Sequence, residues 1–205
     1  MIAIIDYGVG NLFSLRSSLN KIGADTVVTA DPEVIAKADK LILPGVGAFA
    51  DAAKKLRDSG LDKVIKAEAA AGKPIMGICL GMQMLFEKSF EYGEHEGLGL
   101  LKGAVVPMEG SIPANLKIPH IGWNALHFQK ESPLFRYIKE GDCVYFVHSF
   151  YAANCDESTV ATAEYGAELT AAVAKANVFG CQFHPEKSGD VGLNILRAFC
   201  QEVSE

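Results

Sequence analysis

Residues 74–83 read PIMGICLGMQ and place Cys79 between two glycines, where a short apolar run meets a segment of helical character. A Gly-x-Cys-x-Gly pattern between a strand and a helix is typical of a nucleophile elbow, because the glycines let strand and helix approach closely and the turn exposes the middle side chain. A cysteine among Ile, Met and Leu is also common in a buried core. The stretch alone leaves both interpretations of Cys79 open.

An elbow would place Cys79 at the N-terminus of a helix. The helix dipole and the unpaired N–H groups there favour a thiolate. The N–H of Leu80 would point toward the oxyanion that forms on an attacked carbonyl group. Such a nucleophile also needs a base, which another part of the chain must supply.

The flanking sequence predicts an α/β fold. Before the elbow, apolar runs without period-two alternation are separated by segments of helical periodicity, a pattern typical of a parallel sheet covered on both faces. After residue 142, strand-like runs follow one another with short connections, as in an antiparallel meander. No long linker or repeat divides the chain, so we expect one domain over 1–205, with a mostly parallel central sheet and an antiparallel extension. The expected strands are 2–5, 25–30, 41–45, 75–78, 143–152, 158–165, 169–177 and 178–184, and the expected helices are 11–22, one that begins at 31–33, 49–58, 61–71, 82–90 and 191–203.

The composition argues against several classes of protein. The 205 residues carry a net charge of −6, which argues against binding to nucleic acid or to an anionic membrane. No apolar run is long enough to span a bilayer and the N-terminal stretch does not resemble a signal peptide, so a cytoplasmic protein is expected. The five cysteines and five histidines are scattered without metal-ligand spacing. We therefore expect no metal and no cofactor.

The tripeptide His184-Pro185-Glu186 ends the last strand-like run. Pro185 disfavours helical geometry at His184, so the tripeptide is expected to be extended, with residues 184 and 186 on the same side. Glu186 would then accept a hydrogen bond from one imidazole nitrogen while the other nitrogen faces a thiol, as in cysteine catalysis. The alternative is a polar strand end with an exposed histidine and glutamate.

The elbow and this tripeptide together resemble the class-I glutamine amidotransferases, whose Cys–His–Glu triad hydrolyses glutamine. Other segments are similar to a narrower family, the glutaminase subunits of imidazole glycerol phosphate synthases, which act in histidine biosynthesis. The resemblance covers nearly the whole chain and implies a three-layer α/β sandwich with a nucleophile elbow. The segments that carry it are DYGVGN at 6–11, LPGVGAF at 43–49, PHIGWN at 119–124, YFVHS at 145–149 and FHPEKS at 183–188.

The resemblance implies a role for each triad residue. Cys79 is the nucleophile that attacks the side-chain amide of glutamine, His184 is the general base and acid, and Glu186 orients His184. The glycine-rich loop 44–47 lacks the Lys-Ser/Thr of a phosphate-binding loop. The resemblance assigns it to the oxyanion hole, with the N–H of Val46 beside that of Leu80 and with Gly47 allowing the loop to flip.

The resemblance also implies residues that bind glutamine and residues that contact a partner. Gln83 lies one helical turn beyond Cys79 and so reaches a substrate held above it. His148 lacks the Pro-Glu context of His184, so it is not expected to be the base. Trp123 is expected at the partner surface, with a buried core tryptophan as the alternative. The implied substrate-binding residues are Gln83, Gly45, Tyr145, His148 and Ser149, and the implied partner contacts are Asn11, Pro119, Trp123 and Lys187.

The implied partner is a cyclase subunit with a (β/α)₈ barrel, which receives ammonia through a channel and forms imidazole glycerol phosphate in a heterodimer. A chain of 205 residues has no room for that barrel, which needs about 250 residues. Two alternatives are disfavoured. PHIGWN and LPGVGAF argue against the amidotransferase subunits of anthranilate or pyridoxal phosphate synthesis, and the complete Cys–His–Glu set argues against a subunit that has lost its chemistry.

Overall fold

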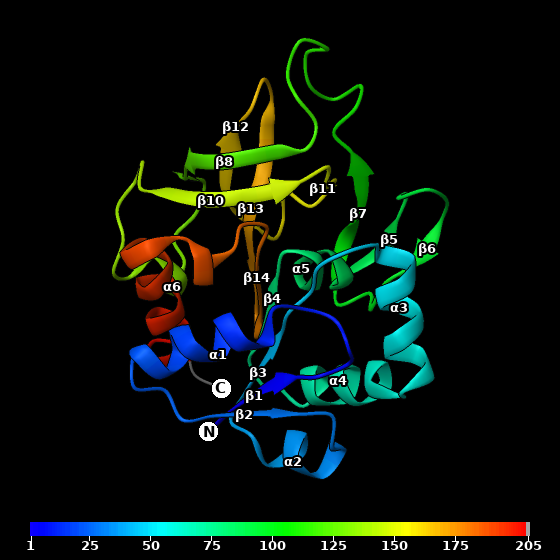
Figure 1. Ribbon diagram of the computed structural model, residues 1–205, viewed down its shortest axis with the longest axis vertical. Coiled ribbons are helices and arrows are strands. Elements are labelled where there is room, and N and C mark those ends of the chain that lie inside the picture. Colours follow the sequence, from blue (N-terminus) through cyan, green and yellow to red (C-terminus); the bar gives the residue numbers. More distant parts are fainter. Residues whose placement is uncertain (204–205) are drawn as a thin grey trace.

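The computed structural model describes residues 1–203 and centres on an eight-stranded sheet, shown in Figure 1. The strand order is β2-β1-β3-β4-β14-β13-β12-β9. The first five strands in this order pair in parallel, and the last three join by antiparallel pairing. The predicted mostly parallel sheet with an antiparallel extension is therefore confirmed. The strands are β1 (Ile2–Ile5), β2 (Thr26–Thr29), β3 (Lys40–Leu43), β4 (Ile75–Ile78), β9 (His127–Phe128), β12 (Thr159–Glu164), β13 (Glu168–Lys175) and β14 (Val178–Cys181).

Helices cover both faces of the sheet, as expected for buried parallel strands. Ile2 and Ile4 of β1 belong to one core cluster, with residues of α1 and α6, whereas Ala3 and Ile5 belong to a second cluster with residues of α2, α3 and α4. This alternation follows from the two-residue period of a strand and produces the three-layer sandwich. The helices are α1 (Leu12–Lys21), α2 (Pro32–Lys37), α3 (Phe49–Asp58), α4 (Leu61–Ala70), α5 (Leu80–Met84) and α6 (Gly189–Gln201), with short 3₁₀ helices η1 (Pro133–Phe135) and η2 (Pro185–Lys187).

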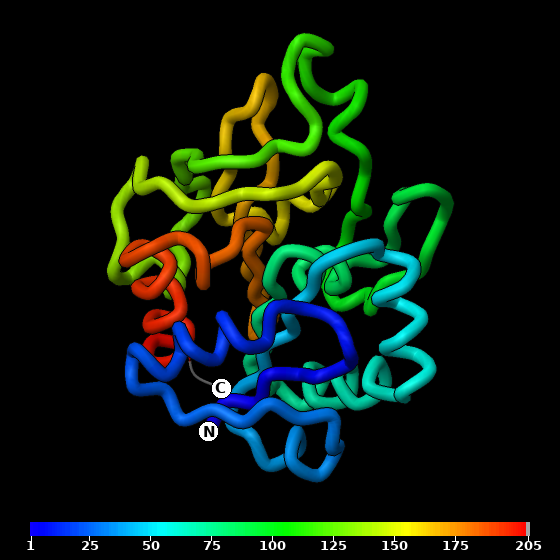
Figure 2. The backbone as a smooth tube through the Cα atoms, in the orientation of Figure 1, coloured from blue at the N-terminus to red at the C-terminus, as the bar shows by residue number. Residues whose placement is uncertain are grey.

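Two smaller sheets add to this core. A two-stranded ribbon of β8 and β10 crosses β12 and β13 in Figure 1. A four-stranded sheet has the order β11-β7-β5-β6, and the chain runs from β7 through the long loop 108–119 to β8 (Figure 2). None of the helices within residues 1–203 is both long and apolar enough to cross a membrane. The added strands are β5 (Phe86–Ser89), β6 (His95–Glu96), β7 (Leu101–Pro107), β8 (His120–Ala125), β10 (Cys143–His148) and β11 (Phe150–Ala153).

Two predictions about these added strands were wrong. The helix expected at 82–90 ends at Met84, and Phe86 already begins β5, because pairing with β7 and burial of Phe86 override the local helical pattern. The run 143–152 is two strands rather than one. It breaks at Ser149, so that β10 pairs with β8 while β11 pairs with β7 in a different sheet.

Candidate active site

Cys79 lies at a strained turn between β4 and α5. Its φ of 54° and ψ of −112° fall outside the regions that side-chain-bearing residues ordinarily adopt. The Cys79 N–H donates to the carbonyl oxygen of Cys181 at 2.8 Å, which holds the turn against β14. A Cβ at Gly77 would lie 2.5 Å from the carbonyl oxygen of Gly81, and a Cβ at Gly81 would collide with the carbonyl oxygen of Leu43. The elbow geometry predicted from GICLG is therefore confirmed.

His184 and Glu186 form a buried pair. Nδ1 of His184 lies 2.8 Å from Oε1 of Glu186, and both side chains are almost completely buried. The backbone N–H of His184 donates to the carbonyl oxygen of Tyr145 at 2.9 Å, and the hydroxyl of Ser188 donates to the carbonyl oxygen of His184 at 2.6 Å. With Nδ1 occupied, Nε2 is the nitrogen that His184 can offer to the thiol of Cys79.

The backbone that joins this pair differs from the expected extended form. Pro185 begins the 3₁₀ helix η2, with His184 as its N-terminal cap in the extended region. The fixed φ of proline suits the first position of such a turn. The turn brings Glu186 back to His184, so the hydrogen bond is present although the predicted extended tripeptide is wrong.

The electrostatics favour a charged imidazole at His184. Burial alone would lower the pKa of His184, but hydrogen bonds to Cys79 and Glu186, together with the negative charges of those groups, raise the pKa to about 9. An imidazolium next to the sulfur is the form that donates a proton to a leaving group.

Cys79 and His184 line one cleft of about 330 Å³. Its walls come from the glycine-rich loop after β3, the start of α5, the segment after β5 and the end of β10. No group of three or more potential metal ligands occurs in the described residues 1–203. Of the residues predicted for catalysis, substrate binding or partner contact, the cleft is lined by Val46, Gly47, Cys79, Leu80, Gln83, Pro119, His148, Ser149 and His184.

The profile of the family described as Glutamine amidotransferase class-I matches residues 3–203. The chain belongs to this family. Three relatives named imidazole glycerol phosphate synthase subunit HisH align with almost all of this amidotransferase. The protein from Lactococcus lactis is 52% identical, with 98% of each chain covered, and the one from Sulfurimonas denitrificans is 54% identical, with 97% of each covered. The relative from Aquifex aeolicus is 50% identical over 98% of this chain and 97% of its own.

Solved structures agree with this membership at the level of the fold. A structure described as a glutamine amidotransferase has a TM-score of 0.75 at 19% identity and covers 97% of this chain and 99% of its own. The structure of PurLQS from Thermotoga maritima has a TM-score of 0.73 at 22% identity, with 97% and 96% covered. The overall arrangement of this chain is thus that of a known fold.

Two residues predicted to bind substrate lie outside the cleft lining. Gly45 packs under the elbow, where a Cβ would lie 2.7 Å from the N–H nitrogen of Gly81. Tyr145 packs against Trp123, with ring centroids 6.1 Å apart, and its backbone N–H donates to Ser188 at 2.9 Å. Because side chains alternate along β10, Tyr145 lies on the opposite face from His148. Gly45 and Tyr145 therefore support the amidotransferase site from outside it.

The residues predicted to contact a partner are on the surface. Trp123 is 58% exposed, so the alternative of a buried core tryptophan is excluded. Asn11 caps α1 by accepting a hydrogen bond from the N–H of Ser14 at 3.2 Å, and it remains exposed. Lys187 and Pro119 are also exposed, and Pro119 lines the amidotransferase cleft.

The sequence interpretation missed several residues of the site. Glu91 lines the cleft and its Oε2 accepts a hydrogen bond from the N–H of Phe49 at 2.8 Å. Tyr92 lines the cleft and packs edge-on against Phe150. Because a helix was predicted at 82–90, the strand β5 and the turn after it, which carries Glu91 and Tyr92, were not expected.

Tyr7, beneath the site, was also missed. Its hydroxyl donates to the carbonyl oxygen of Pro44 at 2.7 Å, next to the loop that carries Val46. Burial, and the nearby Cys79, raise the pKa of Tyr7 well above its ordinary value, so the hydroxyl stays a donor. Tyr7 belongs to the DYGVGN segment quoted above, but its partner lies 37 residues away in the chain and no local pattern identifies it.

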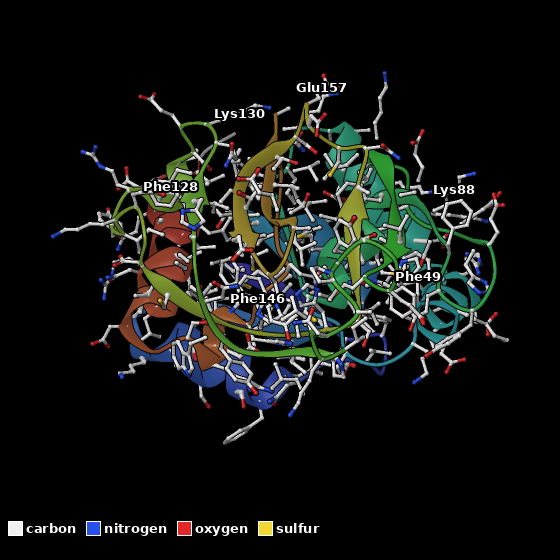
Figure 3. All side chains as sticks on the ribbon, turned by 90° about the horizontal axis from the view of Figure 1, so that it is seen from above. Phe49, Lys88, Phe128, Lys130, Phe146 and Glu157 are labelled. Atoms are coloured by element: carbon white, nitrogen blue, oxygen red, sulfur yellow. The ribbon has the colours of Figure 1, made fainter. Side chains whose placement is uncertain are left out.

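A larger depression than the cleft at Cys79 lies elsewhere on the molecule. A depression of about 860 Å³ lies around Phe128, Lys130 and Arg136. In Figure 3, Phe128 and Lys130 lie toward one side of the molecule and Phe49, beside the cleft-lining Glu91, lies toward the other. The depression contains no cysteine or histidine, so the smaller cleft at Cys79 is the candidate active site.

Proposed function

We propose that this amidotransferase is the cytoplasmic glutaminase subunit of an imidazole glycerol phosphate synthase, and that it hydrolyses glutamine to glutamate and ammonia. The observation that carries the proposal is the shared cleft of Cys79 on its elbow and His184, with His184 held by Glu186. The 50–54% identity with relatives named as HisH subunits supports the choice of synthase.

The reaction begins with attack by the Cys79 thiolate on the side-chain amide carbon of glutamine. The amide oxygen gains negative charge, and the N–H groups of Leu80 and Val46 donate to it. The imidazolium of His184 gives a proton to the amide nitrogen as the carbon–nitrogen bond breaks, so ammonia leaves and a glutamyl thioester remains on Cys79.

Water then cleaves the thioester. The neutral imidazole of His184 takes a proton from this water as its oxygen attacks the thioester carbon, and the thiolate of Cys79 departs with release of glutamate. Glu186 holds the imidazole in one orientation and balances its positive charge in both steps. The raised pKa of His184 suits the first step, in which a proton must be donated.

Recognition of glutamine requires groups for its α-ammonium and α-carboxylate. Glu91 carries the one carboxylate among the residues that line the cleft, so we assign it to the α-ammonium. Gln83 supplies a second polar group at the floor of the cleft. A substrate without the α-amino group would lose this ionic contact with Glu91 and is expected to bind more weakly.

The ammonia produced needs a dry path to a second active site, because ammonia in neutral water is mostly ammonium and is not nucleophilic. We assign that site to a cyclase subunit with a (β/α)₈ barrel. The proposed docking surface contains apolar side chains that are 41–59% exposed, of which Val46 lines the cleft. Two of them, two positions apart in β8, lie on the same exposed face of that strand, as expected for a face that a partner covers. These residues are Val46, Ile118, Ile121 and Trp123.

The test is to compare two nitrogen sources in the complex with the cyclase subunit. Cys79→Ala is expected to abolish synthesis of imidazole glycerol phosphate from glutamine while synthesis from added ammonia continues. Cys143→Ala, at an exposed cysteine that does not line the cleft, is the matched control and is expected to leave both activities intact. Loss of both activities in Cys79→Ala would reject the catalytic role of the thiol.

A further inference from the structure

A buried glutamine contacts the sulfur of Cys79. Gln182 lies two residues before His184, is completely buried, and places Nε2 3.8 Å from Sγ of Cys79. Its Oε1 accepts a hydrogen bond from Nε2 of Gln83 at 2.9 Å. Nε2 of Gln83 also donates to the backbone carbonyl oxygen of Phe150 at 3.1 Å. These contacts form a continuous chain from β11 to the sulfur.

The backbone carbonyl of Phe150 determines which atom of each glutamine amide donates and which accepts. Amide oxygen and nitrogen atoms are assigned from their partners, and a carbonyl oxygen can only accept. The atom of Gln83 that faces the carbonyl oxygen of Phe150 must therefore be its nitrogen. That nitrogen also faces Gln182, which must present its oxygen in return. The amide nitrogen of Gln182 is consequently the atom that faces Cys79, and Gln83 can offer only its Oε1 to the cleft.

A second branch meets the same carbonyl oxygen. Nδ1 of His148 lies 2.9 Å from the oxygen of Phe150, so Nδ1 carries the proton. Burial lowers the pKa of His148 to about 4, which keeps the ring neutral, and its Nε2 accepts from Nδ1 of His120 at 3.1 Å. His120 is itself stacked against Tyr165 and Phe146, with centroids 4.1 Å and 5.0 Å away. Both nitrogens of His148 are occupied, so this ring fixes the carbonyl rather than serving as a base.

We propose that Gln182 stabilises the Cys79 thiolate by donating this N–H, and that the carbonyl of Phe150, acting through Gln83, fixes the Gln182 amide in the donating orientation. A sulfur anion accepts a hydrogen bond more strongly than a neutral thiol does, so the contact favours the reactive form. Each amide in such a buried hydrogen-bonded chain keeps one orientation, because the opposite orientation would leave a buried polar group unpaired at a cost in free energy. The inference rests on the proposed function, in which Cys79 is the nucleophile.

Other titratable groups also face Cys79. The imidazole of His184 approaches from the turn after β14, with Glu186 behind it, and the Tyr7 hydroxyl approaches from the end of β1. The Cys181 thiol on β14 is also close, and its burial raises its pKa well above the ordinary value, so it stays neutral. Substitution of Gln182 leaves all of these groups in place.

The experiment is alkylation of Cys79 by iodoacetamide across a range of pH in the full chain, followed by mass spectrometry of the Cys79 peptide. Gln182→Glu keeps an oxygen for Gln83 but removes the N–H that faces sulfur. The new carboxylate also brings a negative charge close to the sulfur. Because a hydrogen bond to the thiolate is lost and a like charge is added, the midpoint of the alkylation profile is expected to rise by about one pH unit or more. Gln182→Met, of similar length and without charge, is expected to shift the midpoint in the same direction by less.

Gln129→Glu is the matched control, because Gln129 bonds to Thr162 on the antiparallel extension and not to the site. A rise in the midpoint in both Gln182 variants, with no change in the control, supports the contact. Unchanged midpoints in both variants would overturn it, even if glutamine hydrolysis falls, because Gln182 would then act only through packing. Alkylation needs no glutamine, so a shifted midpoint in a chain that hydrolyses no glutamine, even with the cyclase subunit present, upholds the contact and rejects the proposed function.

Discussion

Replacing Glu186 by glutamine tests the charge balance of the catalytic pair. In the wild type, Oε1 of Glu186 lies 2.8 Å from Nδ1 of His184. The Glu186→Gln substitution keeps an oxygen for Nδ1 but removes the negative charge. Burial alone would lower the pKa of His184, but hydrogen bonding and electrostatic attraction to Cys79 and Glu186 raise it from 6.5 to about 9. Removing one of two such neighbours is expected to lower the pKa by about 1–2 units, within the range for a close opposite charge.

The assay is an NMR titration of the imidazole of His184 in the free chain. Glu140→Gln is the matched control, because it removes the carboxylate that lies 3.0 Å from Nδ1 of the exposed His127. The His184 titration is expected to move to lower pH in Glu186→Gln and to stay in place in Glu140→Gln. If it does not move in Glu186→Gln, the carboxylate is not what keeps His184 charged.

The same shift has a consequence for stability. The folded-state pKa of His184 lies above its unfolded value, so its stabilising contribution is fully present below pH 6.5 and is lost as pH rises through 9. A rise of the His184 pKa from 6.5 to about 9 corresponds to about 3 kcal/mol of unfolding free energy. Urea unfolding of the wild type is expected to show this loss between pH 6 and pH 9.5, and Glu186→Gln is expected to show a smaller one.

Three further substitutions test other parts of the site. Tyr7→Phe leaves the Pro44 carbonyl without its buried donor, so the free energy of unfolding measured in urea should fall by about 1–3 kcal/mol. The kcat for glutamine hydrolysis should also fall. The control is Tyr165→Phe, which loses a hydrogen bond to an exposed loop carbonyl and should leave kcat unchanged. Glu91→Gln should raise KM for glutamine about tenfold or more, since an ionic contact to the α-ammonium is lost; an unchanged KM in saturation curves would refute that contact. Gly81→Ala forces a Cβ against the Leu43 carbonyl and should cost more than about 3 kcal/mol of stability, and a variant that melts like the wild type would contradict the close packing of the elbow.

The elements that were predictable from sequence are those that local patterns encode. The Gly-x-Cys-x-Gly stretch specifies the elbow because Gly77 lets α5 approach β4 closely and Gly81 lets α5 approach Leu43 at the end of β3. The parallel strands are recognisable because both of their faces are buried, which produces continuous apolar runs. The His184–Glu186 contact was also predicted, although from the wrong backbone conformation.

The remaining features depend on contacts between distant segments. Phe86 begins a strand only because β7 lies beside it, and the local sequence favoured a helix. The alternation that turns Tyr145 away from the cleft depends on the pairing of β10 with β8, and the partner of Tyr7 is likewise remote in sequence. Gln182 carries no local signal, because its donor role becomes visible only through the carbonyl oxygen of Phe150.

The most direct test of the central claim is covalent labelling with a diazo-ketone analogue of glutamine, followed by peptide mapping of all five cysteines. The account predicts one adduct, on Cys79, that forms faster in the presence of the cyclase subunit and is blocked by excess glutamine. Labelling of another cysteine in its place, or labelling of Cys79 that glutamine does not slow, would contradict it.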